Sequence, residues 1–128
     1  MNRPESKIKG FQHEIDVWKK NLEFIMGENT CLKTRLADVL KAVSSDEDLL
    51  SAAEQYQNNF IREDETIQLL RGDIARLDKL LAKGIYQDGQ VINEVMRKQK
   101  KLAAEMKNAI GEFNKLKFDF NNYLGEVL

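Results

Sequence analysis

The strongest constraint on the fold of this chain is a heptad pattern of apolar residues, which recurs in three tracts of similar length. Within each tract the steps alternate between three and four residues. The tracts are Ile8, Phe11, Ile15, Trp18, Leu22, Ile25, Asn29, Leu32, Leu36, Val39, Val43; Leu49, Ala53, Tyr56, Phe60, Glu63, Ile67, Leu70, Ile74, Leu77, Leu81; and Ile92, Val95, Gln99, Leu102, Met106, Ala109, Phe113, Leu116, Phe120, Tyr123, Val127. Spacing of this kind, sustained for about five heptads, is typical of coiled coils rather than of generic amphipathic helices.

The breaks between the tracts predict helices near 4–44, 47–83 and 89–127. At 1.5 Å per residue each helix is about 55–60 Å long. Because two short connections join them, neighbouring helices must run antiparallel. We therefore expect an all-α fold: one domain, residues 1–128, forming an elongated antiparallel three-helix coiled-coil bundle with the shape of a spectrin repeat.

Two helix ends carry recognisable sequence signals. Ser44 and Glu47 have the spacing of a capping box, which predicts the start of the second helix. Gly84 follows the second tract and suits a left-handed helix end, with Ile85 available for the hydrophobic contact beyond it.

Three polar residues, Asn29, Glu63 and Gln99, interrupt the apolar tracts. The predicted turns place Asn29 and Glu63 at the same level, in one core layer. They also place Gln99 level with Trp18, and the indole N–H of Trp18 is expected to donate a hydrogen bond to the Gln99 side chain. One interpretation is a polar functional site in the core. The other, which we favour, is that these residues fix the helix register at a cost in stability. A buried Glu63 would need a partner or a raised pKa, unless it reaches the edge of the core.

Val17, Phe24 and Cys31 are spaced by sevens outside the main apolar seam of the first helix. We call these three residues the apolar stripe and predict that they form a face for self-association or for a protein partner. Cys31 is expected to act there as a small hydrophobic residue. The single histidine, His13, lies about 27 Å away along the helix, too far to activate its thiol.

Basic residues gather at one level of the predicted bundle, and we call them the basic collar. Its members are Lys19, Lys20, Arg71, Arg76, Arg97, Lys98, Lys100 and Lys101. Such a collar can hold phosphate backbones, although acidic residues among the basic ones favour a solvated, salt-bridged surface. The opposite end of the bundle is acidic.

Composition and motifs exclude several classes of function. The chain has one cysteine, one histidine and a formal net charge of -1, so neither an internal disulfide nor a His-built metal site is expected. No apolar run is long enough for a membrane span. Phosphate-binding loops, di-iron motifs and EF-hand loops are absent from the sequence. We expect no enzymatic activity, cofactor, metal, small-molecule substrate or membrane partner.

Three segments carry a family resemblance. Residues 15–25 are similar to a Trp-x-x-x-Leu-x-Phe opening helix, residues 56–61 to an aromatic-Gln-Asn-x-Phe signature, and residues 113–124 to a closing Glu-Phe-Asn-x-Leu-Lys pattern. Together they resemble small uncharacterised three-helix coiled-coil proteins of Bacteroidetes bacteria. The resemblance implies three long helices and a bacterial, cytoplasmic setting. It transfers no functional residues, although Phe24 belongs to the opening pattern.

These observations predict a non-enzymatic structural or protein-interaction module, which binds itself, as a homodimer, or another protein through a helix face. The alternative prediction is an accessory protein that associates with nucleic acid or the ribosome through the basic collar. A helix-face interaction should tolerate salt, whereas collar binding should collapse as salt rises.

Overall fold

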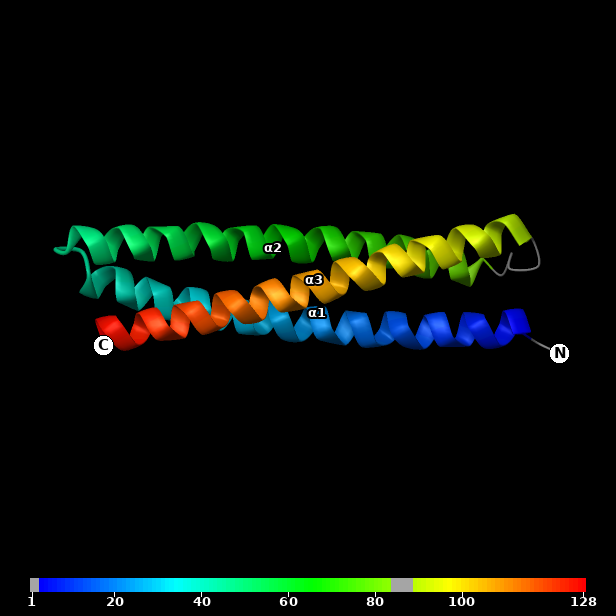
Figure 1. The fold of residues 1–128 in the computed structure, drawn as a ribbon, viewed down its shortest axis with the longest axis horizontal. Helices are drawn as coiled ribbons and strands as arrows, with labels where there is room; N and C mark the ends of the chain where they lie inside the picture. The colour runs from blue at the N-terminus through cyan, green and yellow to red at the C-terminus, as the bar shows by residue number, and fades with distance from the viewer. Residues whose placement is uncertain (1–2, 84–88) are drawn as a thin grey trace.

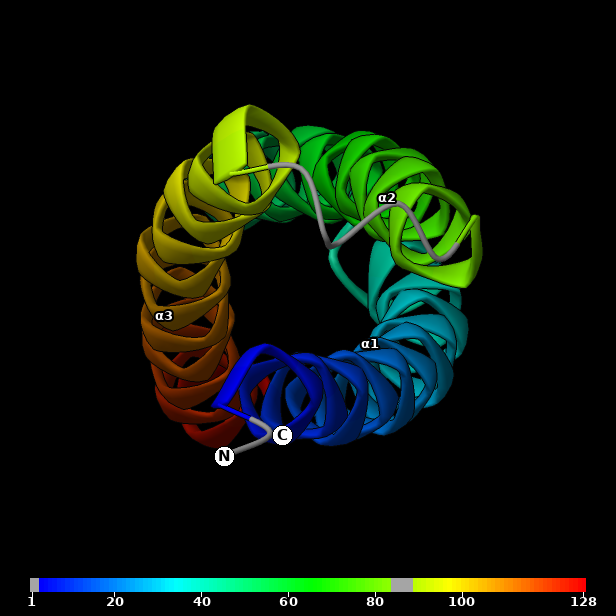
Figure 2. The ribbon, with the colours of Figure 1, turned by 90° about the vertical axis from the view of Figure 1, so that its right-hand side faces the viewer.

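The computed structural model describes residues 3–83 and 89–128, with side chains from Lys7 onward. It contains three long helices, α1 (Arg3–Ala42), α2 (Glu47–Ala82) and α3 (Gly89–Val127). The helices lie side by side along one long axis (Figure 1) and wind around a common centre when viewed from the end (Figure 2). Each helix packs against both others. The predicted all-α three-helix bundle is therefore confirmed.

The helix boundaries agree with the heptad breaks to within two residues, but the cap of α2 differs from the prediction. Asp46 is the N-cap, and its side chain accepts hydrogen bonds from the backbone N–H groups of Asp48 and Leu49, each at 3.1 Å. The Ser44 hydroxyl instead donates to the carbonyl of Lys41 at 3.3 Å. The predicted capping box is thus wrong, because aspartate two residues further on is an equally strong cap. The predicted Gly84 cap lies outside the described residues.

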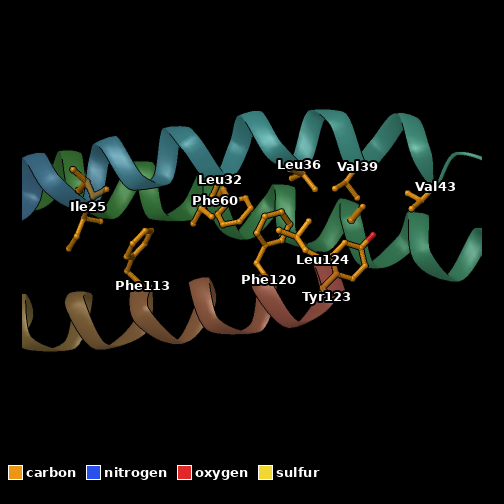
Figure 3. Packing of buried hydrophobic residues seen from close by; sticks show 12 residues of the cluster. Ile25, Leu32, Leu36, Val39, Val43, Phe60, Phe113, Phe120, Tyr123 and Leu124 are labelled. Carbon is orange, nitrogen blue, oxygen red and sulfur yellow. The ribbon is translucent and has the colours of Figure 1, made fainter. Parts of the chain in front are cut away.

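The core lies along the heptad seam of all three helices. Among the described residues, every side chain classed as buried belongs to the three predicted tracts, with the single exception of Leu124. The buried apolar side chains form two clusters, one toward each end of the rod. In the cluster near the α1–α2 turn, Phe60, Phe113 and Phe120 point toward the leucine and valine side chains of α1 (Figure 3).

Two tyrosines fix the alignment of α2 against α3. The hydroxyl of Tyr56 donates to the carbonyl of Asp119 at 3.1 Å, and that of Tyr123 donates to the carbonyl of Leu49 at 2.7 Å. Their rings contact each other, with centroids 5.1 Å apart, and Phe120 packs against both, at 5.2 Å from Tyr56 and 6.1 Å from Tyr123. These contacts match the register expected if the second connection is centred near residue 87, because both pair residues whose distances from that position agree to within two residues.

Candidate functional site

Asn29 lies at the centre of a polar layer between α1 and α2. Its side chain is fully buried, and the amide donates to the carbonyl of Phe60 at 3.1 Å and to Oδ1 of Asp64 at 2.8 Å. Lys33, one turn along α1, binds the other oxygen of Asp64 at 2.5 Å. The predicted level is correct, and at this level the side-chain partner of Asn29 is Asp64, the residue next to Glu63.

Asp64 was missed by reasoning from the sequence because it stands one position beside the seam. A signal was nevertheless available: Asp64 follows the core residue Phe60 by four residues, which puts the two on adjoining parts of one helix face. A buried amide needs a hydrogen-bond acceptor. Because Asn29 was expected at the level of residues 60–64, the carboxylate of Asp64 was a candidate acceptor for it.

Glu63 is half-buried and forms no ion pair or hydrogen bond within the described part of the chain. Burial raises the pKa of its carboxyl group, and the nearby carboxylates of Glu112 on α3 and of Asp64 raise it further. Because its side chain is only half-buried, Glu63 lies at the edge of the core, which was one of the alternatives expected from the sequence, and its pKa is raised as well. A half-buried carboxylate among other carboxylates destabilises the bundle when it is ionised.

Gln99 of α3 lies between Val95 and Leu102, in the half of the rod away from the α1–α2 turn, and its side chain is 4% exposed. Both amide atoms of its side chain lack a hydrogen-bond partner among the described residues. The predicted hydrogen bond from the indole of Trp18 is therefore wrong, although Trp18 is buried as expected. Asn29, Glu63 and Gln99 do not form one site, and their unsatisfied groups carry a cost in stability.

The apolar stripe lies on the outer face of α1, as the heptad positions predicted. Phe24 is 66% exposed and Val17 41% exposed, and Cys31 is a free, exposed cysteine. Beside the apolar stripe, Glu28 of α1 forms an ion pair with Lys117 of α3 at 2.7 Å. This ion pair joins α3 to the same side of α1.

Other large apolar side chains are also exposed on α2 and α3, but the most exposed one within each of these helices is not part of a seven-residue repeat. Leu69 of α2 is 70% exposed and Phe118 of α3 is 65% exposed. The residues seven positions before and after each of them are arginine or glycine, so neither belongs to a seven-residue repeat like that of the apolar stripe. Exposure of isolated apolar residues is normal for a soluble domain. Leu69 was not singled out from the sequence, since it lies off the heptad tracts.

The residues of the basic collar are all exposed and lie on all three helices. Half of them are paired within the bundle: Lys19 with Asp78, Arg76 with Asp73, Lys98 with Glu94, and Lys101 with Glu105. The hydrogen bond to Asp78 raises the pKa of Lys19. This pairing lowers the net positive charge that the collar presents to an anion.

The described part of the chain contains no group of three or more His, Cys, Asp or Glu side chains placed to hold a metal ion. None of its helices combines the length and the apolar character needed to cross a membrane. Comparison with models of known protein families, with curated proteins and with solved structures gave no match to this chain.

Proposed function

We propose that this protein is a non-enzymatic structural module that associates with a second copy of itself through the outer face of α1. The observation that carries the proposal is the exposure of the apolar stripe, whose members repeat every seven residues along one helix face. A seven-residue repeat is the spacing by which one helix meets another in a coiled coil. The bundle's own seam occupies a different face of α1, so the stripe is free for a further helix.

Phe24 is the largest side chain of the apolar stripe and is 66% exposed. A phenylalanine side chain moved from water into a packed interface contributes about 1.5–3 kcal/mol. In a symmetric dimer the same residue contributes twice, once from each protomer. The stripe is narrow, so the proposed association is modest in affinity and depends on protein concentration.

The test is light scattering coupled to size exclusion over a concentration series, on the wild type and on Phe24→Glu. The expected result is a wild-type dimer that Phe24→Glu converts to a monomer, because the change places two carboxylates in the apolar interface. Phe118→Glu is the matched control, since Phe118 is equally exposed on another helix; this variant should remain dimeric. A wild type that is monomeric at all concentrations would refute the proposal.

The alternative function, association with nucleic acid or the ribosome, is supported by Lys20, Arg97 and Lys100. These collar residues have no ion pair within the described part of the chain. Four other collar residues already form ion pairs within the bundle, so they contribute less to the binding of an anion. This makes association with nucleic acid the weaker proposal. It predicts binding to a nucleic-acid duplex that weakens steeply with salt and is lost in Lys100→Glu/Lys101→Glu.

A further inference from the structure

We infer that the second copy lies antiparallel to the first, with Phe24 of both protomers at the twofold axis. The inference rests on the self-association proposed above and adds the orientation and the residues that meet. Two features carry it: the position of the stripe along the rod, and the uneven distribution of charge between the two ends of the rod.

Phe24 is the middle residue of the stripe and lies close to the midpoint of α1 (Arg3–Ala42). A twofold axis at Phe24 therefore aligns two antiparallel rods over nearly their whole length. Val17 and Cys31 each lie seven residues from Phe24, a separation of about 10.5 Å along the helix. In this arrangement Val17 of one protomer lies opposite Cys31 of the other, and the stripe is complementary to itself.

The two ends of the rod differ in charge. The α1–α2 turn and the end of α3 lie together at one end (Figure 1). In these segments, 43–56 and 119–128, all the charged side chains are acidic: Asp46, Glu47, Asp48, Glu54, Asp119 and Glu126. The opposite half carries the basic collar, where basic residues outnumber the carboxylates at the same level even after their internal ion pairs are counted.

This charge distribution decides between the two possible orientations. An antiparallel pair places each acidic end beside the basic half of the other protomer, whereas a parallel pair places like ends together. The difference between the orientations is largest at low ionic strength, where the Debye length reaches about 30 Å at 0.01 M salt.

Thiol cross-linking with a short bismaleimide at low ionic strength tests the orientation. The first protein is the wild type, whose only cysteine is Cys31. The second is Val17→Cys/Cys31→Ser. Both positions are exposed, so folding should be retained, and thermal melting followed by circular dichroism checks this.

The expected result is that neither protein alone cross-links, because identical positions in an antiparallel dimer lie about 21 Å apart along the axis. An equal mixture should give a covalent heterodimer, since the two thiols then face each other. Efficient cross-linking of the wild type alone would overturn the inference in favour of a parallel dimer. Absence of a heterodimer in the mixture would also overturn it, provided that light scattering shows a dimer dependent on Phe24. A monomeric wild type in light scattering would instead refute the proposed self-association.

Discussion

Replacement of Glu63 by leucine should stabilise the bundle, because this carboxylate is half-buried and unpaired within the described part of the chain. Complete burial of a leucine side chain is worth about 1.5–3 kcal/mol. At a half-buried position about half of that is gained, and removal of the poorly solvated charge beside Glu112 and Asp64 adds a smaller amount, because solvent screens a partly exposed carboxylate. We expect the free energy of unfolding to rise by about 1–3 kcal/mol in total.

Glu63→Gln separates the two contributions, because it removes the charge and leaves a polar side chain. The folded-state pKa of Glu63 is raised, so ionisation of Glu63 destabilises the folded state once the pH exceeds the pKa of the unfolded chain, about 4.3. Below that pH the carboxyl group is protonated in both states and the penalty vanishes. The advantage of Glu63→Gln over the wild type should therefore be largest near neutral pH and shrink as the pH falls toward 4.

The assay is thermal and urea denaturation of the wild type and both variants, followed by circular dichroism from pH 4 to 7. Protein concentration is held constant because self-association raises the apparent stability. For a chain of 128 residues, the expected gain of Glu63→Leu at pH 7 corresponds to a Tm increase of about 4–11 °C. A lower Tm for Glu63→Leu, or a difference between Glu63→Gln and wild type that does not change with pH, would refute the reasoning.

Three further predictions concern the core, and each is measured as a change in the urea denaturation midpoint. Gln99→Leu should stabilise by about 1–3 kcal/mol, since both polar atoms of the buried amide lack partners; a loss of stability would contradict this. Asp64→Ala should destabilise by about 1–3 kcal/mol because it removes the acceptor of the Asn29 amide, while the control Lys33→Ala should cost less than about 1 kcal/mol as a partly exposed ion pair. Phe60→Ala should cost about 3–5 kcal/mol as a cavity in the aromatic cluster, and a cost below 1 kcal/mol would show that this cluster is loosely packed.

The prediction of the core from the sequence succeeded because a coiled coil has a one-dimensional rule. An apolar residue at a heptad position faces the seam whatever its neighbours are, so Ile15, Phe60 and Phe113 could be assigned without knowledge of the other helices. Turn positions and equal helix lengths then fixed the register, which the hydrogen bonds of Tyr56 and Tyr123 match.

The partners of the polar residues could not be predicted in the same way. Heptad position gives the level of a side chain along the rod, but hydrogen bonding depends on separations of a few tenths of an ångström and on side-chain direction. For this reason Asn29 was placed at the correct level, but its acceptor, Asp64, was not identified. A hydrogen bond from the Trp18 indole to Gln99 was predicted only because the two residues lie at the same level along the rod. The side-chain amide of Gln99 has no hydrogen-bond partner among the described residues.

The sequence by itself determined the three helices, their order, their antiparallel arrangement and the residues of the core, because periodicity and turn length are local properties of a chain. It also placed the apolar stripe outside the seam. Only the tertiary structure decided that Asp64 pairs with Asn29 and Lys33, that Gln99 is left without a partner, and that half of the basic collar is neutralised by ion pairs. These outcomes depend on the approach of side chains from different helices, and no pattern within one helix encodes that geometry.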